Sequence, residues 1–133
     1  MGKVLIGCES SGIVRDAFLA LGHDAWSCDL LPSAKPTNRH IIGDVRDVMM
    51  GDWDLLCIQH PPCTRLANAG ARWLTKPPNK LEAGHYTDQQ REAFALMSEA
   101  ERLEFMWQEL DKGAELFSDL WNVAHIPRVA VEN

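Results

Sequence analysis

Residues 4–21 read VLIGCESSGIVRDAFLAL, and they contain the pattern from which the fold class follows. A short apolar run at residues 4–8 leads through a Gly/Ser-rich turn into residues 12–21, where apolar side chains recur at helical spacing. That order is typical of one βα unit. Further apolar runs, each bounded by polar or turn residues, stand at residues 25–28, 40–42, 54–58 and 128–132. We therefore predict an α/β fold with a mostly parallel sheet flanked by helices.

The length and composition agree with one globular domain spanning residues 1–133. The sequence has 133 residues, of which 46% are hydrophobic and 24% are charged, which is enough for a single core. Its four cysteines form no C-x-x-C pair and follow no secretory leader. No apolar run approaches the roughly 18 residues of a membrane span. We therefore expect a soluble, cytoplasmic protein with reduced thiols.

Charge is spread unevenly along the chain. The formal net charge of −6 argues against a surface that coats nucleic acid in general. Residues 64–86 have the opposite balance, because their lysines and arginines face only one acid, Glu82. These cations are Arg65, Arg72, Lys76 and Lys80. A locally basic segment therefore belongs to an otherwise acidic protein.

Two segments rich in turn-forming and polar residues, 30–39 and 60–87, are predicted to be loops at the carboxyl edge of the sheet. The second is long enough for a functional lid. Residues 88–97 are predicted to be helical, and the capping box Ser98-Glu99-Ala100-Glu101 predicts the start of a longer helix. One apolar stripe of that helix is expected to face the sheet: Leu103, Met106, Trp107, Leu110, Ala114, Phe117 and Trp121.

Small and acidic residues follow the first three predicted strands. The turn at residues 7–12, Gly-Cys-Glu-Ser-Ser-Gly, brings backbone N–H groups to the start of a helix, where a ligand can approach. Asp29 can accept both ribose hydroxyls of a nucleoside-like cofactor, and Asp44 can lie beside its base. Each aspartate could instead be a helix cap or turn residue, which is the commoner role. The turn lacks G-x-G-x-x-G, which argues against NAD and leaves an adenosyl cofactor without pyrophosphate.

A thiol follows the strand predicted at residues 54–58, after Pro61 and Pro62. A strand that stops on two prolines presents the next side chain at the carboxyl edge, where open α/β folds place their chemistry. The basic segment beyond Cys63 favours its thiolate form, which attacks electrophiles. If the last two strands are neighbours, the carboxyl group of Glu132 and this thiol face one cleft. A small buried side chain is the alternative for Cys63.

The spacing of Cys57, His60 and Cys63 also suggests a zinc site. Zinc requires about four convergent ligands. Residues three apart on a strand point to opposite faces, so Cys57 and His60 diverge, and His85 is distant in the sequence. We therefore predict that the protein holds no metal.

Taken in order, these residues resemble the cytosine-C5 DNA methyltransferases, especially the short methylase-like proteins of phages. Residues 4–12 are similar to the family's cofactor-binding first motif, and residues 60–64, His-Pro-Pro-Cys-Thr, to its Gly-Pro-Pro-Cys-Gln. Residues 131–133, Val-Glu-Asn, are similar to its Glu-Asn-Val. The matches run in family order across essentially the whole chain. The resemblance implies a Rossmann-like class I methyltransferase fold that binds S-adenosyl-L-methionine.

The resemblance also implies roles for individual residues. Cys63 would add to C6 of a cytosine in DNA while Glu132 hydrogen-bonds N3 of the base. The base would be flipped out of the duplex, and the basic segment would close over it, with Trp73 and Tyr86 as stacking side chains. The implied cofactor-binding residues are Cys8, Glu9, Ser10, Gly12, Asp29, Leu30, Asp44, Val45 and Pro61. The implied DNA-binding residues are Arg65, Arg72, Trp73, Lys76 and Lys80.

The chain departs from the family in two respects. Ser10 and Ser11 replace glycines of the first motif, and nothing in the sequence matches the later Arg-bearing motif, the target-recognition region or the C-terminal helix. We therefore expect a domain lacking the C-terminal strands, either part of a longer enzyme or a reduced relative. A second hypothesis is a catalytically silent module that binds nucleic acid or a protein partner. A third is a methyltransferase that acts on a free cytosine nucleotide.

Overall fold

The computed structural model describes residues 2–61, 66 and 68–132, and the chain divides into two compact units. One unit contains residues 1–61 and 116–133, and the other contains residues 62–115. The sequence alone gives no sign of this division, because no linker-like segment separates the units and one long helix contributes to both.

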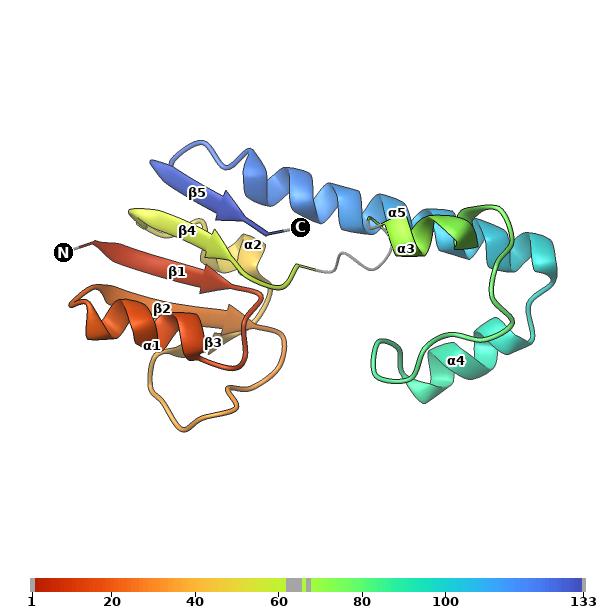
Figure 1. Ribbon diagram of the computed structural model, residues 1–133, viewed down its shortest axis with the longest axis horizontal. Coiled ribbons are helices and arrows are strands. Elements are labelled where there is room, and N and C mark those ends of the chain that lie inside the picture. Colours follow the sequence, from red (N-terminus) through yellow and green to blue (C-terminus); the bar gives the residue numbers. More distant parts are fainter. Residues whose placement is uncertain (1, 62–65, 67, 133) are drawn as a thin grey trace. The chain divides into compact units, whose positions relative to one another are not determined.

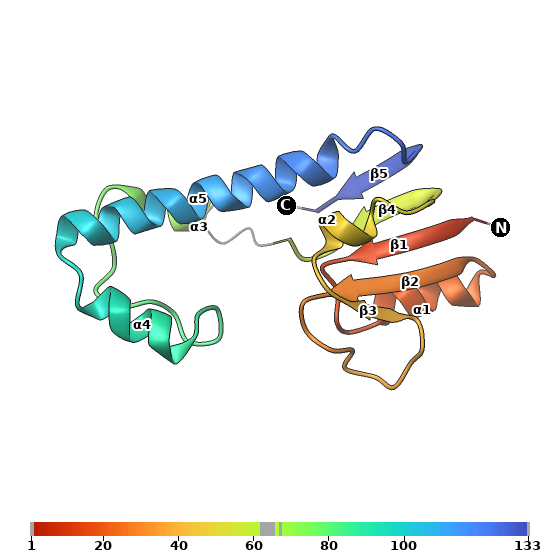
Figure 2. The ribbon, with the colours of Figure 1, turned by 180° about the vertical axis from the view of Figure 1, so that it is seen from behind.

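The first unit is built on a sheet whose strands all run parallel (Figures 1 and 2). The strands are β1 (Lys3–Gly7), β2 (Asp24–Asp29), β3 (His40–Ile42), β4 (Leu55–Ile58) and β5 (Arg128–Val131). Their order across the sheet is β3-β2-β1-β4-β5. The prediction of a parallel α/β sheet is confirmed, and each strand overlaps the apolar run that predicted it.

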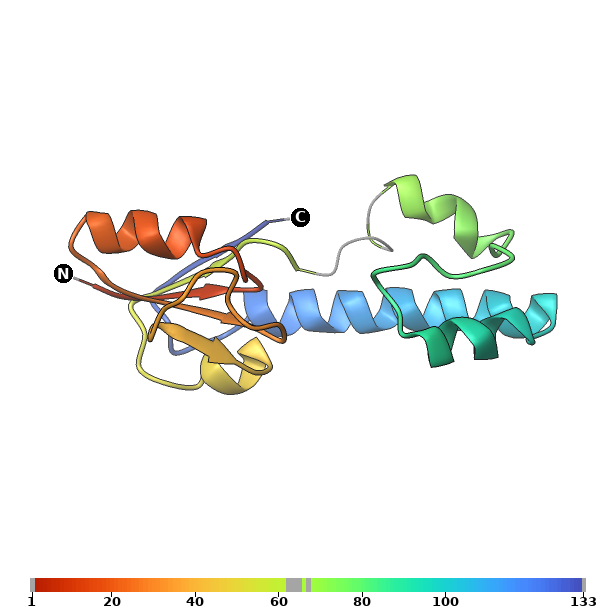
Figure 3. The same ribbon diagram turned by 90° about the horizontal axis from the view of Figure 1, so that it is seen from below.

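Alternate residues of β1 face two different layers of helices. Val4 and Ile6 are buried in one cluster with side chains of α1 (Ile13–Ala20). Leu5 points the other way, into a larger cluster to which α2 (Val45–Val48) and the last part of α5 (Glu99–Trp121) contribute. Figure 3 shows α1 on one face of the sheet and α2 with the end of α5 on the other. Because both faces are covered, β1 reads as a continuous apolar run rather than an alternating one.

The short helix α2 is an element that the sequence pattern does not reveal. It has only four residues, too few to display a helical period. Its N-cap is Asp44, whose Oδ1 accepts the backbone N–H of Arg46 at 2.9 Å. Asp44 therefore has the capping role that the sequence left open as an alternative.

The second unit is helical and has a small core of its own. It contains α3 (Asn68–Ala71), the 3-10 helix η1 (Arg72–Leu74), α4 (Asp88–Ala95) and the first part of α5. Leu81, Phe94 and Met106 are fully buried and form the centre of this core. The prediction of an unbroken loop over residues 60–87 is wrong for residues 68–74, which are helical.

The apolar residues of α5 are divided between the two cores. Met106 packs in the second unit, whereas Leu116 and Leu120 belong to the cluster against the sheet. Trp107 and Trp121, both predicted to face the sheet, are 47% and 56% exposed. The prediction of a single stripe facing the sheet is therefore wrong. Where apolar side chains lie on more than one side of a helix, helical spacing alone does not show which of them are buried or in which core.

Replacing Ser98 by Ala should lower the free energy of unfolding by about 1 kcal/mol. The predicted capping box at the start of α5 is present: Ser98 Oγ accepts the N–H of Glu101 at 3.2 Å, and Glu101 Oε1 accepts the N–H of Ser98 at 3.1 Å. Without the hydroxyl, the first of these N–H groups loses its acceptor. Denaturant unfolding measures the change, and Ser98→Thr, which keeps a hydroxyl, is the control. An equal loss in both variants would contradict the capping role.

Candidate functional site

The order of the strands marks one place on the sheet as the expected site. The chain moves outward from β1 to β2 and β3, and then returns to β4 on the other side of β1. In open parallel sheets, ligands bind outside the carboxyl ends of the strands at such a change of direction. In this sheet the change of direction lies between β1 and β4, where the N–H of Gln59 donates to the carbonyl oxygen of Gly7 at 3.0 Å. The segments that follow these two strands therefore form the candidate site.

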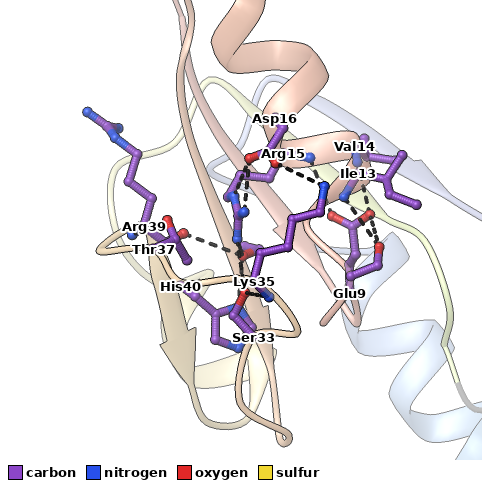
Figure 4. Close-up of polar contacts among 12 residues, drawn as sticks. Glu9, Ile13, Val14, Arg15, Asp16, Ser33, Lys35, Thr37, Arg39 and His40 are labelled. Atoms are coloured by element: carbon purple, nitrogen blue, oxygen red, sulfur yellow. Dashed lines mark hydrogen bonds and ion pairs between the residues drawn. The ribbon is translucent and has the colours of Figure 1, made fainter.

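The turn after β1 is held by a buried acid, Glu9, which is only 2% exposed. Its carboxylate accepts the backbone N–H groups of Val14 at 3.0 Å and Arg15 at 3.3 Å, and the hydroxyl of Ser11 at 3.1 Å (Figure 4). Glu9 thus satisfies donors at the N-terminus of α1 from inside the protein. The side chain of Glu9 is largely withdrawn from solvent. Its predicted role as a cofactor ligand stays a prediction.

A buried cation, Arg15, underlies the same turn and is 1% exposed. Its guanidinium donates to Ser27 Oγ at 3.0 Å and to Asp16 Oδ1 at 2.9 Å (Figure 4). The sequence pattern does not mark Arg15 as buried, because arginines are common on exposed helix faces. A usable signal is its position three residues before Phe18, on the side of α1 that packs on the sheet.

The loop between β2 and β3 is docked onto this turn by several polar contacts. The backbone N–H of Ala34 donates to Ser10 O at 2.8 Å, and Lys35 Nζ lies 3.5 Å from Asp16 Oδ2. One nitrogen of the His40 ring lies 2.7 Å from Ser27 Oγ and the other 2.9 Å from the carbonyl oxygen of Leu31. These contacts fix the loop that follows Asp29, and, like Arg15, His40 has a supporting role that its place in the sequence does not indicate.

Asp29 lies at the end of β2 with part of its carboxylate available. Its Oδ1 accepts the N–H of Leu31 at 2.9 Å, and among the described residues its Oδ2 has no hydrogen-bond partner. The next side chain, Leu30, is 73% exposed. A hydrogen-bond acceptor beside an exposed apolar side chain can accommodate the ribose and base of a nucleoside.

Asp44 and Val45, at the end of β3, are more fully engaged by the protein. Both carboxylate oxygens of Asp44 accept hydrogen bonds from the Arg46 side chain, at 3.2 and 2.9 Å, and this pairing lowers the pKa of Asp44. Val45 is 5% exposed and belongs to the core beneath β1 and β4. Any contact of Val45 with a cofactor would therefore be made by its backbone.

The ends of β4 and β5 lie side by side, as the proposed pairing of thiol and carboxyl group requires. Ile58 pairs with Val131, and the N–H of Glu132 donates to Ile58 O at 3.0 Å. The carboxylate of Glu132 is 60% exposed, and its Oε2 lies 3.8 Å from Nδ1 of His60. Pro61 is buried. Cys63 itself, the predicted nucleophile, lies outside the described residues.

The basic segment belongs to the second unit. Arg65 lies outside the described residues, whereas Arg72, Lys76 and Lys80 are exposed. The guanidinium of Arg72 lies 4.3 Å from the centre of the Trp73 ring. Trp73 and Tyr86 are half-buried against the core of this unit. These two aromatic residues therefore have a packing role, and their contact with nucleic acid stays a prediction.

Burial raises the pKa of each of the described thiols. Burial, together with Asp29, Cys28 and Asp44, raises the pKa of Cys8 to about 12. Burial is likewise the main cause that raises the pKa of Cys28 to about 11, and it also raises the pKa of Cys57. Asp29, at the end of β2, and Asp44, after β3, both contribute to the raised pKa of Cys8, so these two carboxyl groups lie near the turn after β1.

We expect iodoacetamide to alkylate Cys8 far more slowly in the folded protein than in the unfolded one at about pH 8, because the thiolate is the reactive form. A pKa of about 12 in place of 9.0 lowers the thiolate fraction about a thousandfold. Mass spectrometry of the digested protein follows each cysteine separately. Protein unfolded in guanidinium is the control, and there all cysteines should react at similar rates. Equal rates for Cys8 in the two states would contradict the shifted pKa.

Together, the fold and the site define an open α/β domain with helices on both faces of a parallel sheet and polar residues at its strand ends. Comparison of the chain with models of protein families, with curated proteins and with solved structures found no match. In the part of the chain that the structure describes, no helix is long and apolar enough to cross a membrane. Within the same residues, no group of three or more His, Cys, Asp or Glu side chains could hold a metal ion. An assignment of function therefore rests on the chemistry of the strand ends.

Proposed function

We propose that this chain is a methyltransferase domain that transfers a methyl group from S-adenosyl-L-methionine to C5 of cytosine in DNA. The observation that carries this proposal is the grouping of polar residues at adjacent strand ends. Asp29 ends β2, Asp44 follows β3 on the same side of β1, and Glu132 directly follows β5, the strand next to β4. A nucleoside cofactor and a target base would then be bound at neighbouring positions along one edge of the sheet.

The cofactor half of the proposal rests on Asp29 and Leu30. Asp29 Oδ2 is available to accept a ribose hydroxyl, and the exposed Leu30 offers an apolar surface to the adenine ring. Leu31, the next residue, is held by the Asp29 carboxylate and by the His40 ring, so this segment is ordered before a ligand arrives. When bound, S-adenosylmethionine supplies a methyl group on a positively charged sulfur, which is attracted by the acidic strand ends.

The base half of the proposal assigns nucleophilic catalysis to Cys63. Its thiolate forms a bond to C6 of cytosine, and the carboxyl group of Glu132, in its acid form, donates a hydrogen bond to N3, which stabilises the negative charge pushed into the ring. C5 then forms a bond to the methyl group, and the electron pair of the broken methyl–sulfur bond stays on the cofactor sulfur. A base removes the C5 proton, the bond between Sγ and C6 breaks, and the Cys63 thiolate is restored.

One observation favours the catalytically silent module as a second candidate. The side chain of Arg46 binds both carboxylate oxygens of Asp44, and Arg46 also lies 3.4 Å from Asp119. An adenine amine that used Asp44 would compete with this ion pair. In the silent module, the same fold would bind DNA or a protein partner without the cofactor.

Asp29→Ala should weaken the binding of S-adenosylmethionine about tenfold or more, because hydrogen bonds to a charged group contribute about 1.5–3 kcal/mol each. Isothermal titration calorimetry measures the dissociation constant of the wild type and the variant. Asp52→Ala, which removes an exposed aspartate away from the strand ends, is the matched control and should bind like the wild type. Equal affinity of Asp29→Ala and wild type would contradict the cofactor site. Retained DNA binding with no binding of S-adenosylmethionine would favour the silent module.

A further inference from the structure

We infer that the turn after β1 selects its nucleoside ligand by charge: it accepts a neutral or cationic group at the 5′ carbon and rejects a phosphate there, with Glu9 as the specificity-determining residue. The inference rests on the proposed function, because that function assigns this turn to the cofactor. It goes further by stating which nucleosides the turn excludes and which side chain excludes them.

The first argument is that the donors at the start of α1 are already used. In phosphate-binding turns, the free N–H groups at a helix N-terminus point at the ligand. Here the N–H of Ile13 donates to Ser11 Oγ at 3.3 Å. The N–H groups of Val14 and Arg15 donate to the Glu9 carboxylate. That of Asp16 donates to the carbonyl oxygen of Gly12 at 2.9 Å. The first turn of α1 therefore offers a phosphate no free backbone donor.

The second argument is that Glu9 supplies the negative charge that a phosphate would bring. The positive end of a helix dipole favours one anion close to its first turn. Glu9 is 2% exposed and has its carboxylate at that place (Figure 4). A phosphate would lie next to this carboxylate without displacing it, and like charges repel strongly where solvent is largely excluded.

The third argument is that the nearest cation cannot compensate. Arg15 is 1% exposed, and its guanidinium is held by Asp16 and Ser27 beneath the turn. The loop cation Lys35 also pairs with Asp16, at 3.5 Å. Asp29 at the end of β2, whose Oδ2 has no hydrogen-bond partner among the described residues, adds a further negative charge at the strand ends. An ammonium or sulfonium group is favoured in such surroundings, and a phosphate is not.

Calorimetry with adenosine, adenosine 5′-monophosphate and S-adenosylmethionine tests this inference on the full chain. We expect the wild type to bind the monophosphate at least tenfold more weakly than adenosine. Glu9→Gln keeps the shape of the side chain and one acceptor oxygen but removes the charge, so it should reduce that difference at least threefold. Glu99→Gln, which neutralises an exposed acid of α5, is the matched control and should leave the difference unchanged.

The possible outcomes separate this inference from the proposed function. Equal affinity of the wild type for adenosine and its monophosphate would overturn the inference, even if S-adenosylmethionine binds. Selection against the monophosphate without binding of S-adenosylmethionine would support the inference and overturn the proposed function. Binding of no nucleoside at all would overturn both. If thermal unfolding shows that Glu9→Gln does not fold, the wild-type comparison still decides. An unchanged difference in a folded Glu9→Gln would overturn the role of Glu9.

Discussion

Cys63→Ser is expected to abolish covalent attachment of the protein to DNA that contains 5-fluorocytosine. In the proposed reaction, with S-adenosylmethionine present, the thiolate adds to C6 and C5 takes the methyl group, and the thiolate then leaves only when the hydrogen on C5 is removed as a proton. Fluorine at C5 cannot leave in this way, so the adduct persists in denaturing gel electrophoresis. A serine hydroxyl is far less ionised than a thiol at neutral pH, so the yield should fall at least about a hundredfold.

The matched control for this experiment is Cys57→Ala. Cys57 lies on β4, close in sequence to Cys63, and its Sγ accepts a hydrogen bond from Gln59 at 2.9 Å. Burial raises its pKa, so it should contribute nothing to the reaction, and the variant should form the adduct as the wild type does. An adduct that survives in Cys63→Ser would contradict the thiol mechanism. Failure of the wild type to form one while it binds S-adenosylmethionine and DNA would favour the silent module.

The strands could be predicted from the sequence because each is a short apolar run that ends at a polar residue or turn. In β1, for example, both faces are covered by helices, so every position from Val4 to Ile6 is apolar. β3 was recognisable from His40 to Ile42 even though Ile42 is 63% exposed, since Gly43 and Asp44 follow it. The polar residues at the strand ends could be predicted as well, because each apolar run stops at one of them.

The partners of the polar side chains could not be predicted. An acid that follows a strand has the same sequence pattern whether it caps the next helix or binds a ligand, so the contacts of Glu9 with the N–H groups of Val14 and Arg15 could not be foreseen. Arg15 and Ser27 meet only because α1 packs across β1 and β2. The contacts of His40 likewise depend on how the preceding loop folds back. Such contacts depend on tertiary packing, which periodicity does not encode.

The separate core of the second unit was missed for a related reason. Residues 60–87 are rich in proline and polar residues, which predicts a loop. Leu81 is nevertheless fully buried there against Phe94 and Met106. Isolated apolar residues in such a segment show no period, so only the three-dimensional arrangement identifies them as a core. The same arrangement explains why Met106 of α5 packs with Leu81 and Phe94 in the core of the second unit.

Gly12→Ala should lower the free energy of unfolding by about 3 kcal/mol, for two separable reasons. Gly12 has φ of 78°, a left-handed conformation that costs an L residue about 1 kcal/mol. A Cβ at this position would also lie 2.4 Å from the guanidinium nitrogen NH2 of the buried Arg15. The guanidinium would have to move, which would break its hydrogen bonds to Ser27 of β2 and Asp16 of α1.

Two other glycines separate these causes when unfolding in denaturant is followed by circular dichroism. Gly84 has φ of 91° but nothing within 4 Å of an added Cβ, so Gly84→Ala should show only the conformational cost of about 1 kcal/mol. Gly43 has open space and no positive φ, so Gly43→Ala should change stability by less than about 0.5 kcal/mol. If Gly12→Ala costs no more than Gly84→Ala, the guanidinium of Arg15 does not support the turn. A larger cost at Gly12 means that the same cation that neutralises Asp16 also fixes the backbone of the proposed cofactor turn.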